Sequence, residues 1–174
     1  MAEATALVAR PVTLRRAQPV DNAQIAAIWN HEVTSTTATM DTEPRSLAAQ
    51  RRWLAAHDDA HPVIVAVDGD DVLAYGSLSP YRDRPAFCST VADSVYVRVD
   101  LRGAGLGSRV VAELLRLARD RGHHAVMARI TADNEASRRL HARLGFAVAG
   151  IERETAEKFG RRHDIVIMQR LLRR

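Results

Sequence analysis

The sequence predicts an α/β fold built on a mixed sheet. Short runs rich in valine and isoleucine alternate with segments of helical period through most of the 174 residues. Some neighbouring runs are separated only by a turn, as at residues 68–71, which indicates hairpins as well as strand–helix units. We expect one domain over residues 12–174, long enough to bury a core, after a flexible extension at residues 1–11.

The first half of the chain is expected to hold two helices and three strands. The strands are predicted at residues 12–17, 62–67 and 72–78. Asp21 or Asn22 can cap the first helix. Its core side carries four apolar residues, Ile25, Ala26, Ile28 and Trp29. Residues 42–45 indicate the start of the second helix. Its expected core contacts are Leu47, Trp53 and Leu54.

The second half is predicted to begin with the central strand. A polar loop at residues 81–85 leads into this strand, which we expect over residues 87–99. A helix ending near residues 121–122 follows, with an apolar side formed by Val110, Val111, Leu114, Leu115 and Ala118. A shorter helix is capped by Asn134 and stops at Gly145. The last three strands are predicted at residues 124–130, 146–151 and 164–168, with a loop at residues 158–163.

Composition and charge argue against several classes of function. The formal net charge is +4, but basic and acidic residues are interspersed, and Lys158 is the only lysine among 25 basic residues. We therefore expect no nucleic-acid partner. The apolar runs are too short to cross a membrane, and residues 1–10 lack a signal-peptide pattern. Cys88 is the only cysteine, which excludes an internal disulfide and favours the cytoplasm.

Residues 95–108 carry the strongest functional signal. Valines at alternate positions predict a strand with one buried face, and Gly103, Gly105 and Gly107 precede an amphipathic helix. The free N–H groups and the dipole of such a helix start form an anion site. A Walker loop would need a Gly-Lys-Ser/Thr ending, and a dinucleotide fingerprint would need G-x-G-x-x-G spacing. An R-x-x-G-x-G loop at residues 102–107 and an ordinary strand-to-helix turn remain as interpretations.

Residues 12–172 resemble the GNAT acetyltransferases, whose pyrophosphate loop has the R-x-x-G-x-G pattern. A second signature of that family covers residues 134–146. Stretches that resemble the phosphinothricin / methionine sulfoximine N-acetyltransferases lie at residues 28–33 with the threonines that follow, at residues 94–98 and at residues 158–161. The resemblance implies acetyl-coenzyme A (acetyl-CoA) as cofactor, a small amino-acid-like amine as the molecule that is acetylated, and a homodimer.

The resemblance also implies where the cofactor lies. Helices would cover both faces of a mostly antiparallel sheet, and strands four and five would splay apart. The pantetheine arm would occupy the splay, paired with the main chain of Val95, Tyr96 and Val97. The residues expected to meet the pyrophosphate are Arg102, Gly103, Ala104, Gly105, Leu106, Gly107 and Ser108.

Asn134, Ser137 and His141 are further expected cofactor contacts, because their spacing places them on one stripe of a helix. Asn134 is first of all a good helix cap. His141 stands where many GNAT enzymes have a tyrosine that donates a proton to the leaving thiolate. Its ordinary pKa of about 6.5 suits that catalytic role, and a half-buried surface histidine is the alternative.

Acceptor binding is assigned to the loop before the central strand. Arg82 and Arg84 offer the bidentate geometry that a carboxylate or phosphinate needs. Phe87 is a candidate wall of the acceptor pocket. The alternatives are solvated surface arginines and, for Phe87, ordinary core packing.

Asp93 is the expected general base. The closer family has a glutamate at the preceding position, where this chain has Ala92. In a regular strand Asp93 would face away from that position, on the side of Val95 and Val97. We expect a bulge that turns Asp93 toward the acceptor; the alternative is a buried partner for its carboxylate.

Two other functions remain open. The same fold suits acetylation of a peptide N-terminus or a polyamine. Because Ala92 replaces the glutamate, a catalytically weak acyl-CoA-binding module is the third reading. Turnover with a panel of amines would separate these functions.

Overall fold

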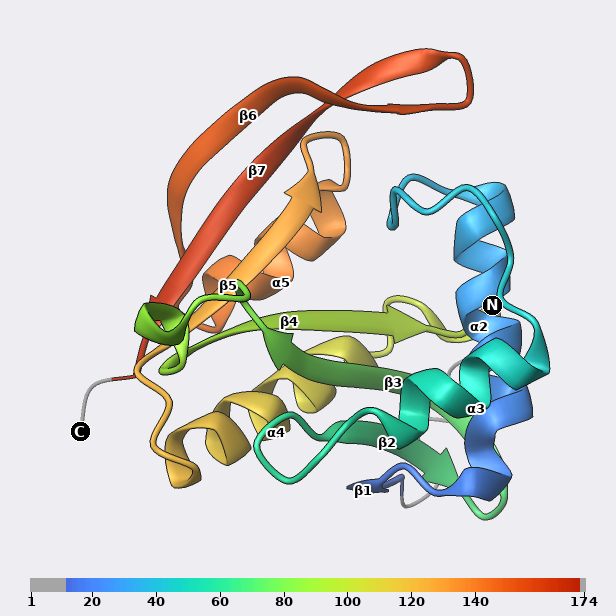
Figure 1. Ribbon diagram of the computed structural model, residues 1–174. Helices are drawn as coiled ribbons and strands as arrows, with labels where there is room; N and C mark the ends of the chain where they lie inside the picture. Colours follow the sequence, from blue (N-terminus) through green and yellow to red (C-terminus); the bar gives the residue numbers. More distant parts are fainter. Residues whose placement is uncertain (1–11, 173–174) are drawn as a thin grey trace.

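The computed structural model describes residues 12–172, which form a seven-stranded sheet flanked by helices (Figure 1). The predicted α/β class is confirmed. The strands are β1 (Thr13–Arg16), β2 (Val63–Asp68), β3 (Asp71–Pro80), β4 (Thr90–Val97), β5 (Ala125–Thr131), β6 (Ala147–Lys158) and β7 (Arg161–Leu171). The α-helices are α2 (Asn22–Ser35), α3 (Leu47–Ala55), α4 (Leu106–Asp120) and α5 (Glu135–Arg143). The extension predicted at residues 1–11 lies outside the described residues.

The sheet separates into two parts between β4 and β5. Its strand order is β1-β2-β3-β4-β5-β7-β6, and β4 and β5 run parallel. They pair only through Thr90–Ala92 and Ala125–Met127. Beyond these residues β4 continues along β3, and β5 continues along β7. The predicted splay between the fourth and fifth strands is therefore confirmed.

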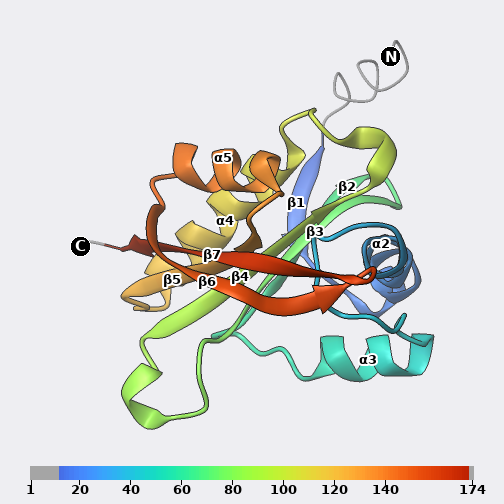
Figure 2. The ribbon, with the colours of Figure 1, turned by 90° about the horizontal axis from the view of Figure 1, so that it is seen from above.

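Each face of the sheet has its own core, because successive residues of a strand point to opposite sides. On β2, Ile64 and Ala66 pack in the core that contains α4, whereas Val63, Val65 and Val67 pack in the core that contains α2. Figure 2 shows α4 and α5 on one side of the sheet and α2 and α3 on the other. Burial of each large aliphatic side chain contributes about 1.5–3 kcal/mol, so both layers are held firmly to the sheet.

Helix α4 packs closely on the sheet, which fixes its N-terminus beside the splay. All five residues of the predicted apolar side are buried: Val110, Val111, Leu114, Leu115 and Ala118. Gly76 of β3 permits the close approach, because a Cβ there would lie 2.7 Å from both the Ser94 carbonyl oxygen and a methyl carbon of Val110. No helix within residues 12–172 has the length and apolar character needed to cross a membrane.

Helix α3 begins later than predicted. It starts at Leu47 rather than within residues 42–45, because Ser46 caps it by accepting a hydrogen bond from the Ala49 amide at 3.1 Å. As the first helical residue, Leu47 is 42% exposed and is not the core contact we expected. The predicted contacts of Trp53 and Leu54 with the core are confirmed.

Strand β4 is shorter at both ends than the predicted strand at residues 87–99. A 3-10 turn at Pro85–Phe87 precedes it, and another at Val99–Leu101 follows it. The second turn leads the chain directly from β4 into the glycine-rich loop before α4.

The C-terminal hairpin is much longer than predicted. Strands β6 and β7 extend through most of the expected loop at residues 158–163 and are joined by a turn of two residues, Phe159 and Gly160. Both turn residues have left-handed backbone, with φ values of 53° and 72°, as tight hairpin turns require. Most of β6 is exposed, so its sequence lacks the alternation of apolar residues that predicts a strand.

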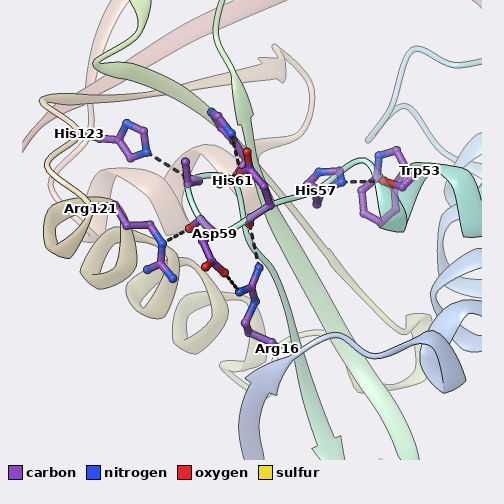
Figure 3. Close-up of polar contacts among 9 residues, drawn as sticks. Arg16, Trp53, His57, Asp59, His61, Arg121 and His123 are labelled. Carbon is purple, nitrogen blue, oxygen red and sulfur yellow. Dashed lines mark hydrogen bonds and ion pairs between the residues drawn. The ribbon is translucent and has the colours of Figure 1, made fainter.

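Polar contacts fix the connection between α3 and β2 (Figure 3). Arg16 donates to the Asp58 carbonyl at 2.8 Å, and the Nε2 atom of His123 lies 3.0 Å from the Ala60 carbonyl oxygen. Arg121 binds the same connection at a third carbonyl. None of these residues lines the cleft described below, so this network supports the sheet away from the site.

Candidate active site

A cleft of about 630 Å³ lies where β4 and β5 separate. Residues 93–97 of β4 and residues 128–130 of β5 line it. The glycine-rich loop and α5 contribute further walls, and the end of α2 with residues 36–38 completes it. The cleft therefore collects side chains from both halves of the divided sheet.

The glycine-rich loop leaves room for a ligand beside the start of α4. Gly103 and Gly105 have φ values of 84° and 81°, and a Cβ at either position would meet no atom within 4 Å. Gly105 precedes the first residue of α4, and no side chain caps this helix. The first amides of α4 can therefore donate to an anion, which the helix dipole also favours. These features fit a pyrophosphate group.

Gly107, the third glycine of the pattern, serves helix packing. A Cβ at this position would lie 2.9 Å from Cδ1 of Leu140 and 3.5 Å from Cγ2 of Val97. The missing side chain thus lets α4 approach both α5 and β4.

Most residues predicted to contact the cofactor lie along the cleft. Val95, Tyr96 and Val97 follow the last β4–β5 pair, so one side of their main chain has no strand partner within the described residues. The other predicted residues that line the cleft are Arg102, Gly103, Gly105, Leu106, Gly107, Ser108, Asn134, Ser137 and His141. Ala104 does not line it.

Asn134 caps α5, as its sequence context predicts. Its side-chain oxygen accepts a hydrogen bond from the Ser137 amide at 3.1 Å. The cap fixes the first turn of α5. Asn134, Ser137 and His141 consequently share the side of the helix that lines the cleft.

Asp93 and His141 form a buried pair in the wall of the cleft. The Nε2 atom of His141 lies 3.0 Å from Oδ2 of Asp93, and the two side chains are only 3% and 1% exposed. Strand β4 pairs with β3 in unbroken register through this region, so the bulge predicted at Asp93 is wrong. Asp93 instead faces the side of Val95 and Val97, where α5 supplies His141 as the partner of its carboxylate.

The partners of His141 define where its protons lie. The Nδ1 atom is 2.8 Å from the Ser137 carbonyl oxygen, which only accepts hydrogen bonds, so Nδ1 carries a hydrogen. Burial lowers the pKa of His141, but the hydrogen bond and charge of Asp93 outweigh burial and raise the pKa above its ordinary value. The ring therefore remains an imidazolium, donating at both nitrogens, to a higher pH than a free histidine would.

This arrangement changes the expected role of His141. Both ring nitrogens already have partners, so neither N–H is directed at a leaving thiolate. The Oδ1 atom of Asp93, in contrast, is buried and has no hydrogen-bond partner within residues 12–172. An unpaired buried carboxylate oxygen is costly, and Asp93 lines the cleft, so a donor that reached this atom would be bound favourably.

Sequence analysis did not predict the ion pair between Arg102 and Glu32. The guanidinium of Arg102 binds the carboxylate of Glu32, whose side chain is only 3% exposed. Thr36 donates to the other carboxylate oxygen at 2.7 Å. Arg102 thus ties the glycine-rich loop to the last turn of α2. The two residues are 70 positions apart, and no local pattern signals such a contact.

Other residues that line the cleft were also not predicted as site residues. Among them are Thr36, Thr37, Ala38, Arg129, Arg139 and Arg143. The first three follow the end of α2 in a threonine-rich stretch that contributes to the family resemblance but was assigned no role in the site. The arginines lie on β5 and α5, where a charged side chain usually faces solvent, so an arginine there does not by itself predict a binding site.

The residues predicted to bind the acceptor lie outside this cleft. Arg82, Arg84 and Phe87 belong to the β3–β4 loop, which precedes the paired end of β4. The guanidinium of Arg82 lies 5.1 Å from the ring centroid of Tyr81 and 5.6 Å from that of Phe87. Both arginines are exposed. The single chain does not bring them to Asp93.

Known proteins share both the sequence and the fold. The sequence matches the acetyltransferase (GNAT) family over residues 25–146. An L-methionine sulfoximine/L-methionine sulfone acetyltransferase of Pseudomonas paraeruginosa is 40% identical over 90% of this chain and 92% of its own length.

Two solved structures superpose closely on this chain. A GNAT superfamily phosphinothricin acetyltransferase from Sinorhizobium meliloti, in complex with acetyl-CoA, gives a TM-score of 0.88 at 32% identity and covers 92% of this chain and 88% of its own. A ribosomal-protein-alanine N-acetyltransferase from Brucella melitensis gives a TM-score of 0.90 at 35% identity, with coverages of 92% and 99%. Together with the splayed sheet and the glycine-rich anion site, these matches show that the chain belongs to the GNAT family and is an acetyl-CoA-dependent N-acetyltransferase.

Proposed function

We propose that this enzyme acetylates the amino group of a small amino-acid-like substrate, of the phosphinothricin or methionine sulfoximine type. The observation that carries the proposal is one cleft that holds an anion site, an unpaired strand edge and the buried Asp93–His141 pair. The substrate class is supported by relatives that match most of the chain and are named for acetylation of methionine sulfoximine or phosphinothricin.

The cofactor half of the cleft is formed mainly by main-chain groups. Bound acetyl-CoA supplies an acetyl group activated as a thioester. Residues 102–108 would donate main-chain hydrogen bonds to its pyrophosphate, each contributing about 1.5–3 kcal/mol when the acceptor is charged. The unpaired edge at Val95, Tyr96 and Val97 would hold the arm of the cofactor, while Asn134 and Ser137 line the facing wall.

Asp93 is the proposed acceptor of the amine proton, directly or through one water. Its Oδ1 atom has no partner among the described residues, and its other oxygen is held by His141. In this proposal His141 orients the carboxylate through its hydrogen bond to Oδ2. Donation from His141 to the leaving thiolate would first require one of its two contacts to break.

Kinetics of Asp93→Asn test this role. General base catalysis contributes about 10²–10⁴-fold, so we expect kcat to fall at least tenfold and the acidic limb of the pH–rate profile to change. Asp100→Asn is a matched control, because Asp100 is exposed and pairs with Arg98 outside the cleft. An unaltered pH profile in a folded Asp93→Asn enzyme would show that Asp93 is not the base.

A panel of amines tests the substrate class. We expect the highest kcat/KM with phosphinothricin, methionine sulfoximine or methionine sulfone, and low values with polyamines. The relative named a ribosomal-protein-alanine N-acetyltransferase makes a peptide N-terminus the second candidate acceptor. Faster turnover of an N-terminal alanine peptide would favour that candidate, and no turnover of any amine would favour a weak acyl-CoA-binding module.

We also infer a homodimer and a cytoplasmic location. Val148 and Ile151 on the edge strand β6 are more than half exposed, and Leu171 on β7 is 46% exposed, which supports an apolar contact surface. The exposed free thiol of Cys88 suits a reducing compartment. Sedimentation equilibrium of the wild-type protein and of Ile151→Glu tests the dimer, which this substitution should weaken.

A further inference from the structure

Lys158 is the only lysine in the sequence. It is the last residue of β6, directly before the tight turn at Phe159 and Gly160. Its side chain is almost completely buried, with the residue 4% exposed. A buried cation in a chain that otherwise uses only arginine requires a specific explanation.

The ammonium of Lys158 joins the C-terminal hairpin to the segment that follows α2. It donates to the Thr39 carbonyl at 2.7 Å and approaches the Glu32 carbonyl at 3.4 Å. The Nζ atom of Lys158 also lies over the ring of Phe159, 5.1 Å from the ring centroid. No carboxylate within residues 12–172 forms an ion pair with it. Burial lowers its pKa, although the charges of Asp41 and Glu32 act in the opposite direction.

The other strand of the hairpin is attached to the end of β5. Arg161 binds Asp133 at 2.8 Å, and Thr37 donates to the second oxygen of the same carboxylate at 3.2 Å. Thr131 of β5 donates to the Thr37 carbonyl at 2.9 Å. The hairpin tip therefore meets both the segment after α2 and the loop after β5, an approach that Figures 1 and 2 both show.

Residues 36–39 are held by these contacts together with the hydrogen bonds of Thr36 to Glu32 and of Thr39 to the Tyr96 side chain. Helix α2 ends at Ser35, so these residues have no continuing helix to hold them. Thr36, Thr37 and Ala38 nevertheless line the cleft. The expected cofactor contacts lie on β4, α4 and α5, which pack in a core that includes Val166 and Met168 of β7 but no residue of the hairpin tip. Residues 36–38 thus belong to the part of the cleft wall that carries no expected cofactor contact, as do Arg129 and Asp133.

We propose that Lys158 is a positioning residue for the acceptor, because it locks residues 36–39 into the cleft wall through the Thr39 carbonyl. A lysine suits this position since its compact ammonium can reach two carbonyl oxygens and an aromatic ring together. The planar fork of an arginine matches paired carboxylate oxygens better than this arrangement. The proposal rests on the proposed acetylation of a small amine.

Steady-state kinetics and calorimetry of Lys158→Met test the proposal. We expect the KM for the acceptor to rise at least tenfold, while the Kd for coenzyme A changes less than twofold. Arg162→Met is the matched control, because Arg162 is an exposed cation on the same hairpin outside the cleft, and it should change neither constant more than twofold. Lys158→Gln keeps an N–H donor and should recover part of the acceptor affinity. An equal loss of affinity for both ligands would overturn the proposal.

Hydrogen exchange provides a test that needs no substrate. In the free protein, amides of residues 36–41 should exchange at least tenfold faster in Lys158→Met than in the wild type, with β4 and α4 unchanged. Unchanged exchange over residues 36–41 would overturn the proposal even if no acceptor had been found. Failure of the proposed function would appear separately, as a wild-type enzyme that acetylates no amine. If Lys158→Met does not fold, the same exchange comparison with Lys158→Gln decides, with an intermediate increase expected.

Discussion

The buried Asp93–His141 pair should make a large, pH-dependent contribution to stability. The side chains of His141 and Asp93 are only 3% and 1% exposed, and Nε2 of His141 lies 3.0 Å from Oδ2 of Asp93. Removing one partner of such a pair leaves a buried group without compensation, which costs about 3–5 kcal/mol. We therefore expect Asp93→Asn to lower the free energy of unfolding by about that amount at pH 6.

The pH dependence follows from the raised pKa of His141. A pKa that is higher in the folded state gives stability that is fully present below the unfolded value of about 6.5. That stability is lost as the pH rises through the folded pKa. Asp93→Asn removes the hydrogen bond and charge that raise the pKa, so the gap between wild type and variant should narrow at high pH.

Urea unfolding at pH 6, 7.5 and 9 measures this gap. Asp100→Asn serves as the control, because its exposed ion pair with Arg98 should contribute little at any of these pH values. A gap below about 1 kcal/mol at pH 6, the value expected for an exposed pair, would refute the buried-pair reasoning. So would a gap that increases with pH, since it would require the pKa of His141 to be lowered by folding.

Three other substitutions test separate parts of the cleft. Gly105→Val places a side chain at a left-handed position beside the expected pyrophosphate, and calorimetry of the folded variant should show at least a tenfold loss of coenzyme A affinity. Glu32→Gln removes the buried negative charge that pairs with Arg102, which frees the guanidinium to bind the cofactor. Coenzyme A affinity should then rise by about tenfold, the equivalent of one charge-assisted hydrogen bond. A decrease in affinity would mean that Glu32 positions Arg102 for the cofactor. Arg82 lies outside the cleft of the single chain, so it can hold the acceptor only if the proposed dimer brings it there. In that arrangement Arg82→Ala should raise the KM for a carboxylate-bearing amine and leave the KM for acetyl-CoA unchanged, whereas equal effects on both KM values would indicate a structural role.

The elements that sequence analysis predicted are those with strong local signals. The apolar side of α4 and the glycine pattern before it lie within 17 consecutive residues, 102–118, so their periodicity and backbone requirements are readable without tertiary information. The long β6–β7 hairpin was not predicted, because β6 is exposed over most of its length and lacks apolar alternation. The start of α3 was misplaced because residues 42–45 have an equally good helix-start pattern, whereas the helix begins after Ser46, which accepts the capping hydrogen bond.

The Asp93–His141 pair shows where local reasoning stops. Strand parity correctly placed Asp93 with Val95 and Val97 if β4 is regular, and helix spacing placed His141 with Ser137. Neither rule states that the two faces meet. Their meeting depends on α5 packing beside β4, a contact between residues 48 positions apart. The expected bulge was wrong because this packing gives the carboxylate a partner without any distortion of the strand.

The two halves of the cleft differ in how they are encoded, and this difference explains what the sequence reveals about function. The cofactor half consists mainly of main-chain groups, glycines and a helix start within residues 95–108, and Asn134 and Ser137 complete it from a second local pattern on α5. The proposed acceptor half depends on side chains such as Thr37, Asp133 and Lys158, whose tertiary contacts span separations of up to 119 positions. Contacts between residues so far apart leave no local motif in the sequence. The resemblance that implied the cofactor could therefore rest on residue spacing, whereas in our proposal the choice of amine depends on how the hairpin holds residues 36–39.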